Sequence, residues 1–193
     1  MDNNATIYTE TNQLVLRQFC LTDIESFYLY RSRPDIARFQ SWDNYQHDQA
    51  VAFINKQIEA SPNIPGAWLQ YAVALKTTNQ LIGDCAVHTL ETVPDIVEIG
   101  FTIAPEYQGK GYATEAVTGL LGYLFEILHK HKVIAYSNVE NESSIRLLER
   151  VGMRREGYLL QNYRSKGIWV DEYLYAILQQ EWKHSLEHQN LSI

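Results

Sequence analysis

The stretch from Asp95 to about His129 constrains the fold most, because its hydrophobic period changes across a loop with two glycines. From Asp95 to Ile103, apolar and polar residues alternate, which predicts a strand with one buried face. From Tyr112 onward, apolar residues recur at the spacing of a helix that buries one side. We therefore predict a strand, a short glycine loop and a long helix. The strand's apolar face would carry Val97, Ile99, Phe101 and Ile103, and its other face Glu98, Gly100 and Thr102.

The remaining segments predict a mixed α/β fold. Helices are expected after a capping box of Thr22 and Glu25, after a cap at Asp48, and over residues 141–151. Residues 181–193 are expected to form a fraying tail. Three antiparallel strands would lead into the glycine loop, and one strand–helix–strand crossover would follow. The further strands are expected at residues 14–19, 68–76, 81–90, 133–137, 153–160 and 168–178.

Composition predicts one globular domain over residues 1–193, with a core at about 14–182 and a short tail at 183–193. The 193 residues suffice for one full core, and 46% hydrophobic with 20% charged residues is a globular composition. No apolar run approaches the ~20 residues of a membrane span, and the first residues lack a signal-peptide pattern. Two cysteines without metal-type spacing favour free thiols in a reducing cytoplasm.

Net charge and the positions of the histidines limit the kinds of ligand that the protein is expected to bind. The formal net charge is −7, which argues against nucleic acid and is compatible with a cationic small molecule or a basic peptide. The six histidines form no metal-binding pattern, so no metal is expected. A membrane partner is not expected either, and a homodimer is possible.

Three phosphate-binding patterns can be compared at the glycine loop. A Walker loop needs two glycines five residues apart followed by Lys and Ser or Thr, which this stretch lacks. A dinucleotide fingerprint needs a third small residue where Thr114 stands, and it belongs to a first βαβ unit. The third pattern is a pyrophosphate bound by backbone N–H groups at the helix start, with Gly109 and Gly111 keeping side chains away and Lys110 adding charge. The alternative to all three is an ordinary tight turn before a helix, with no phosphate bound.

Two motifs give the chain a family resemblance. The residues Gln108-Gly109-Lys110-Gly111-Tyr112-Ala113 match the Gln/Arg-x-x-Gly-x-Gly/Ala signature of the GNAT acetyltransferases. The segment from Asn141 to Met153, NESSIRLLERVGM, resembles that of the Rim-type branch, the ribosomal-protein alanine N-acetyltransferases and their relatives. The resemblance spans about Leu14 to Trp182. It implies the GNAT fold, a mostly antiparallel twisted sheet with helices on both faces, and acetyl-CoA as acetyl donor.

The resemblance also implies the residues of the site. Glu98 would be a general base, or would only fix backbone or bind a cationic substrate. Ser144 would donate a hydrogen bond or proton to the sulfur, or would only cap its helix. Leu148 stands where many relatives carry a tyrosine acid. The implied cofactor contacts are Phe101, Thr102, Ile103, Gln108, Gly109, Lys110, Gly111, Tyr112, Ala113, Thr114 and Asn141.

The acceptor is the least constrained part of the prediction. A peptide or protein α-amine, with a pKa near ~8, is neutral far more often at pH 7 than a lysine amine near ~10.4. A site without a tyrosine acid should suit this easier amine, and the Rim-type resemblance points the same way. The alternatives are a small cationic amine, such as a polyamine or an aminoglycoside, and a non-catalytic module that senses acyl-CoA.

Overall fold

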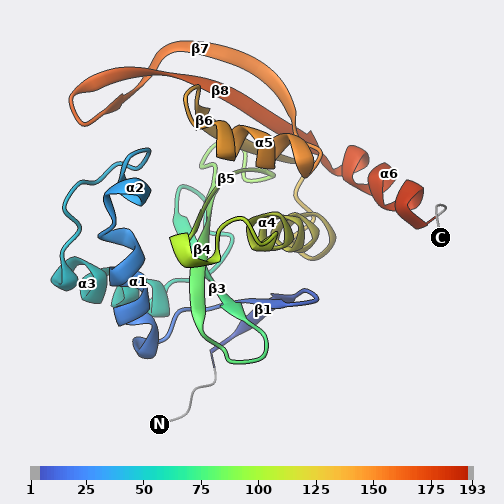
Figure 1. Ribbon diagram of the computed structural model, residues 1–193. Helices are drawn as coiled ribbons and strands as arrows, with labels where there is room; N and C mark the ends of the chain where they lie inside the picture. Colours follow the sequence, from blue (N-terminus) through green and yellow to red (C-terminus); the bar gives the residue numbers. More distant parts are fainter. Residues whose placement is uncertain (1–4, 191–193) are drawn as a thin grey trace.

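One eight-stranded sheet organises the molecule (Figure 1). The computed structural model describes the backbone of residues 5–190 and the side chains of residues 5–184. The strand order is β1-β2-β3-β4-β5-β6-β8-β7, and every neighbouring pair is antiparallel except β5 and β6. The strands are β1 (Ile7–Glu10), β2 (Leu14–Arg17), β3 (Trp68–Leu75), β4 (Leu81–Thr89), β5 (Ile96–Ile103), β6 (Lys132–Asn138), β7 (Arg154–Ser165) and β8 (Ile168–Leu178).

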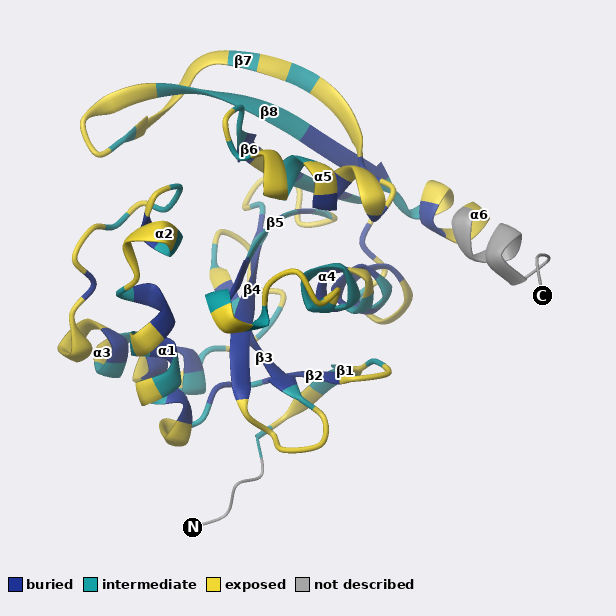
Figure 2. Ribbon diagram, in the orientation of Figure 1, coloured by how far each residue is buried: buried dark blue, intermediate teal, exposed yellow. Residues whose placement is uncertain are grey.

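Helices cover both faces of this sheet. On one face, α4 and α5 enclose a core that includes Leu120, Leu124 and Leu148. On the other face, α1 and α3 enclose a smaller core around Phe27 and Ile54. Figure 2 shows the buried residues concentrated where helices meet strands. The helices are α1 (Ile24–Arg31), α2 (Pro34–Ala37), α3 (His47–Glu59), α4 (Tyr112–Gly122), α5 (Glu142–Arg150) and α6 (Gln179–Asn190). The predicted mixed α/β fold with a mostly antiparallel sheet is therefore confirmed.

The two parallel strands separate soon after they meet. β5 and β6 pair only at Ile96–Lys132, Val97–Val133 and Glu98–Ile134. Beyond Glu98, the edge of β5 that would face β6 has no strand partner within residues 5–190. Because a strand edge carries free N–H and C=O groups, this gap is a place where a ligand can pair with backbone.

The β7–β8 hairpin extends beyond the helical layers as an arm, which we define as residues 159–172 (Figure 1). Its two-residue turn is Lys166-Gly167, with φ of 49° and 85°. Left-handed residues at both positions match the twist of the flanking strands, which is why such turns suit hairpins. The prediction ended the first strand of this hairpin at residue 160, whereas β7 continues to Ser165 across a register shift between Leu159 and Tyr163.

Several predicted helix boundaries were wrong. The first turn before α1 is capped by Cys20 with Asp23 at its third position, not by Thr22 and Glu25. α3 begins one residue before Asp48, with Gln46 as its cap. In each case the cap residue precedes the one that the sequence pattern favours.

The ends of two predicted segments also differ. The helix predicted to reach His129 is α-helical only to Gly122, continues as a π-helical turn over Tyr123–Ile127, and ends where His129 has a φ of 53°. Residues 179–190 form α6 instead of a fraying tail, with Trp182 buried against the core. The strand β1 and the single-turn α2 were not predicted.

Candidate active site

The glycine loop leads directly into α4. Gly111 is the cap of α4 with a φ of 85°, and Gly109 has a φ of 72°, so both adopt the left-handed conformation that favours glycine. The first N–H bonded within this helix is that of Glu115, which donates to the carbonyl of Gly111. The preceding N–H groups are left for an outside acceptor. Gln108 ties the loop to the sheet because its Nε2 donates to the carbonyl of Ile103 at 2.8 Å.

A cavity of about 530 Å³, which we call the helix-side cavity, lies against this loop. Of the predicted cofactor residues, Lys110 and Tyr112 do not line it; the Lys110 ammonium lies over the Tyr107 ring, 5.5 Å from its centre. Arg150 also lines the cavity, although the sequence motifs did not predict it; its guanidinium lies 3.4 Å from the Thr114 hydroxyl. The predicted residues that do line it are Phe101, Thr102, Ile103, Gln108, Gly109, Gly111, Ala113, Thr114, Asn141 and Ser144.

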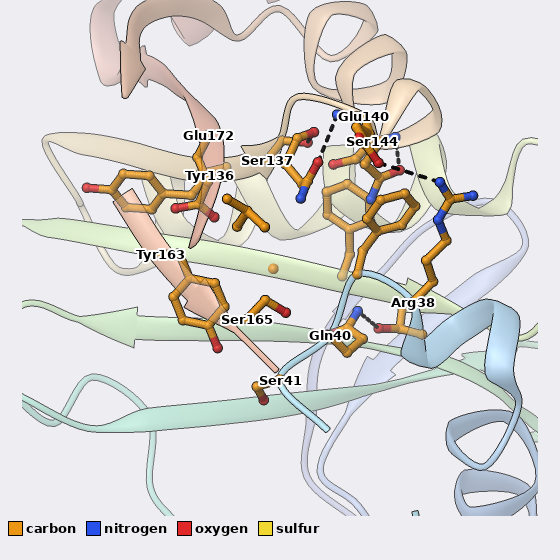
Figure 3. A pocket seen from close by; sticks show the side chains of 18 of the residues that line it. Arg38, Gln40, Ser41, Tyr136, Ser137, Glu140, Ser144, Tyr163, Ser165 and Glu172 are labelled. Atoms are coloured by element: carbon orange, nitrogen blue, oxygen red, sulfur yellow. Dashed lines mark hydrogen bonds and ion pairs between the residues drawn. The ribbon is translucent and has the colours of Figure 1, made fainter. Parts of the chain in front are cut away.

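A second and larger cavity, about 820 Å³, lies between the arm and the segment after α2; we call it the arm-side cavity (Figure 3). Its floor is one face of the sheet, since residues paired across neighbouring strands point the same way. The residues of that face that line it are Trp68, Gln70, Asp84, Ala86, Gly100, Thr102, Tyr136, Asn138 and Glu172.

The two cavities meet at a common wall. Six residues line both of them, and they come from three parts of the fold: the segment after α2, strand β5 and the start of α5. Gln40 and Thr102 face each other across this junction, with Nε2 and Oγ1 3.4 Å apart. A group in one cavity can therefore meet a group in the other at this wall. The shared residues are Phe39, Gln40, Phe101, Thr102, Asn141 and Ser144.

Ser144 stands at this junction in the first turn of α5. Asn141 caps the helix, since its Oδ1 accepts from the Ser144 N–H at 3.2 Å and from the Ser143 hydroxyl at 2.9 Å. The Ser144 hydroxyl makes no hydrogen bond within the described part of the chain, so it differs from the Ser143 hydroxyl. Leu148 is fully buried in the core, whereas Leu147 lines the helix-side cavity.

Glu98 lies on the floor face but lines neither cavity. Its carboxylate is 3.9 Å from His88 Nδ1, and the His88 ring stacks on Trp68 with centres 4.8 Å apart. Burial raises the pKa of Glu98 above its ordinary value, and the charge of Glu172 adds to the increase while His88 opposes it. Glu98 forms the last β5–β6 pair, with Ile134, and therefore lies where the two strands begin to separate.

A buried ionic network that the sequence did not reveal supports the arm-side cavity. The Arg31 guanidinium bonds Asp84 Oδ1 at 3.2 Å and lies between the rings of Phe27 and Trp42. Asp84 Oδ2 also accepts from the Tyr30 hydroxyl at 2.5 Å. Nothing in the local pattern of these residues marks them, because they converge only through packing of α1 on β4.

Other classes of site find no support in the described residues. Between residues 5 and 190 no helix is long and apolar enough to cross a membrane. Among the described side chains, residues 5–184, no three His, Cys, Asp or Glu are placed to hold a metal ion.

Comparison with known proteins identifies the family. Residues 13–154 match the family described as acetyltransferase (GNAT) domain, so the chain belongs to the GNAT acetyltransferases. The chain is 32% identical to the uncharacterized N-acetyltransferase YnaD of Bacillus subtilis over 91% of this chain and 99% of that one. The crystal structure of a Vibrio cholerae spermidine N-acetyltransferase in complex with CoA and spermine is also similar, with a TM-score of 0.75, 27% identity, and coverage of 89% of this chain and 98% of that one.

A third relative differs in the acceptor that its name states. It is the alanine N-acetyltransferase of ribosomal protein uS5 from Escherichia coli, 33% identical over 44% of this chain and 43% of that one. Membership of the GNAT family makes this chain an acetyl-CoA-dependent acetyltransferase. The names of its relatives divide between protein and polyamine acceptors.

Proposed function

We propose that the enzyme transfers the acetyl group of acetyl-CoA to an α-amine at the N-terminus of a peptide or protein. The observation that carries this proposal is the meeting of the two cavities at one wall beside the separated strands β5 and β6. The helix-side cavity suits the cofactor, and the larger arm-side cavity can accept the N-terminus of a peptide. Acceptor and donor would meet near Ser144 and Thr102.

The helix-side cavity has the features that coenzyme A needs. The free N–H groups and dipole at the start of α4 suit a pyrophosphate, and Arg150 adds positive charge at the wall. The open edge of β5 from Ile99 to Ile103 offers backbone groups to the pantetheine arm. In this arrangement Gln108 acts mainly through its bond to Ile103, which fixes the loop.

The chemistry requires one proton to leave the amine and one to reach the sulfur. The neutral amine attacks the thioester carbonyl, the C–N bond forms, and the C–S bond then breaks to release the thiolate of coenzyme A. We assign Glu98 to take the amine's proton through an intervening water, because its carboxylate does not line the cavity. We assign Ser144 to donate a hydrogen bond to the departing sulfur, because its hydroxyl lies at the junction and has no other acceptor among the described residues. A free N–H of β5 would polarise the carbonyl.

The ranking of acceptors rests on proton affinity. At pH 7 roughly a tenth of α-amines are neutral, against about one in 2,500 lysine amines. A site whose base acts through water favours the amine that is easier to deprotonate. A small cationic amine is the second candidate, because the arm-side cavity contains the carboxylate of Glu172.

Competition between blocked peptides tests this proposal. Two peptides of one sequence, one with its N-terminus blocked and one with its lysine side chain blocked, are offered together with acetyl-CoA, and the products are resolved by mass spectrometry. We expect acetylation of the free α-amine. In the same assay, Glu98→Gln should lower kcat most at low pH, and Ser144→Ala should lower kcat with little change in the KM for acetyl-CoA. Modification of lysine alone would contradict the acceptor ranking, and binding of acetyl-CoA without any transfer would indicate a sensor.

A further inference from the structure

The charges that line the arm-side cavity are mostly neutralised within the protein. Its three basic residues each have an acidic partner: Arg31 with Asp84 at 3.2 Å, Arg38 with Glu140 at 3.6 Å, and Lys166 with Asp43 at 2.6 Å. These cations are therefore not available to bind an anionic ligand. The charge of a ligand that the cavity can bind therefore depends on the carboxylates that are not paired with these basic residues.

Two further carboxylates line the cavity, on neighbouring residues of β8. Asp171 has a donor at each oxygen, the Tyr158 hydroxyl and the Gln161 N–H. Glu172 has a single donor, the Asn162 side-chain amide, which lies 2.8 Å from its Oε2. In the described part of the chain, Oε1 of Glu172 accepts no hydrogen bond and no basic side chain pairs with this carboxylate. Glu172 is thus a negative charge on the cavity wall with unused capacity to bind a cation.

The position of Glu172 relates it to the reaction site. It pairs with Asn138 across β8 and β6, so it shares the floor face with Tyr136 and Glu98. Figure 3 shows the Glu172 carboxylate beside the Tyr136 ring, on the far side of the cavity from Ser144. Burial raises the pKa of Tyr136, and the nearby charges of Glu98 and Glu172 raise it further. One end of the cavity is therefore the junction with the cofactor, and the other end is acidic and aromatic.

We propose that Glu172 is a specificity-determining residue, which binds a second positive charge on an acceptor whose primary amine reacts near Ser144. This inference rests on the proposed amine acetylation in the same cavity. A half-buried carboxylate beside an aromatic ring suits an ammonium or guanidinium group. That chemistry occurs both in an aliphatic diamine and in a peptide with a basic side chain close to its free N-terminus. The preferred acceptor would then be dicationic, and a monocationic amine of the same length would bind less well.

Paired acceptors and one isosteric substitution test the role of Glu172. The acceptors are 1,4-diaminobutane against butylamine, and N-terminally free hexapeptides with lysine against norleucine at positions two to four. In Glu172→Gln, we expect the KM of the dicationic acceptor to rise about tenfold, as for the loss of one charged hydrogen bond. The kcat and the KM of the monocationic partner should change less than about twofold. Glu91→Gln, which removes one exposed charge outside both cavities, is the matched control.

The outcomes separate this inference from the proposed function. A gain for lysine only in the peptide pair would identify basic N-termini as the dicationic source, and a gain only in the amine pair would identify diamines; either supports the role of Glu172. Equal KM changes for mono- and dicationic acceptors would overturn it. Calorimetry of 1,4-diaminobutane and the lysine peptides with the coenzyme A complex gives a readout independent of transfer. Glu172-dependent binding without transfer would leave the inference standing and reject the proposed function, whereas equal binding by wild type and Glu172→Gln would reject the inference.

Discussion

Three glycines show how one residue type serves different ends. A Cβ at Gly83 would lie 2.3 Å from the carbonyl oxygen of Thr102, so this glycine permits close packing of β4 on β5. At Gly111 and Gly167 a Cβ would meet nothing within 4 Å, and what favours glycine there is a φ of 85°. Of these three glycines, only Gly111 lines the helix-side cavity. Two constraints therefore disfavour a side chain at Gly111: the backbone conformation and, in our proposal, the bound cofactor.

We expect Gly111→Ala to weaken acetyl-CoA binding by tenfold or more while the protein still folds. The left-handed conformation costs an alanine about 1–2 kcal/mol, and the new methyl group would occupy the approach of the pyrophosphate. Gly167→Ala carries the same strain at the tip of the arm and is the control: it should lose similar stability and keep its acetyl-CoA affinity. Titration calorimetry and thermal unfolding measure the two effects. Equal affinity in both variants would remove the loop from the cofactor site.

At the scale of elements, the start of α5 joins stability to the site. Asn141 satisfies the free N–H of Ser144, and this contact fixes the first turn at the wall shared by both cavities. Asn141 caps α5 at the residue where the sequence predicts this helix to begin. Its contact with the cofactor stays a prediction.

Replacing the cap should therefore have two consequences. Asn141→Ala should lower the free energy of unfolding by about 1 kcal/mol, because the half-buried N–H of Ser144 loses its acceptor. It should also lower kcat, because the turn that holds the Ser144 hydroxyl is released. Asn141→Asp keeps an acceptor oxygen and should retain most of the stability, and Ser143→Ala should change it little. Urea unfolding and steady-state rates check this, and a wild-type kcat in Asn141→Ala would mean that the turn does not position Ser144.

At the scale of the whole molecule, the arm and the segment after α2 form two walls of the arm-side cavity, and Lys166 joins them. Lys166 Nζ, at the tip of the arm, bonds the carbonyl of Ala37 at 2.8 Å and Asp43 at 2.6 Å. Arg38 and Glu140 make a second link, at 3.6 Å, from the same segment to the loop before α5. These links join parts of the chain more than a hundred residues apart and set the width of the arm-side cavity.

We expect Lys166→Gln to raise the acceptor KM severalfold and to leave the KM for acetyl-CoA unchanged. A partly exposed ion pair contributes no more than about 1 kcal/mol, so the melting temperature should change little, while the walls lose their fixed separation. Lys76→Gln, which breaks an exposed pair with Glu10 outside both cavities, is the control. Restoration of the acceptor KM in the double variant Lys166→Asp with Asp43→Lys would show that the pair itself acts. An unchanged KM in Lys166→Gln would mean that the walls are held apart by packing.

The sequence by itself determined the parts of this protein that depend on neighbours along the chain. Alternation defined β5, the glycines and the helical period defined the loop and α4, and Asn141 defined the start of α5, since strand faces, turns and caps are set within a few residues. Only the tertiary structure decided which residues share a cavity. Arg31 with Asp84, Arg150 with Thr114, and Lys166 with Asp43 meet across long sequence separations, and Glu172 reaches the floor face only through the register of β8 on β6. Such contacts follow from the order of strands in the sheet, and no local pattern encodes that order.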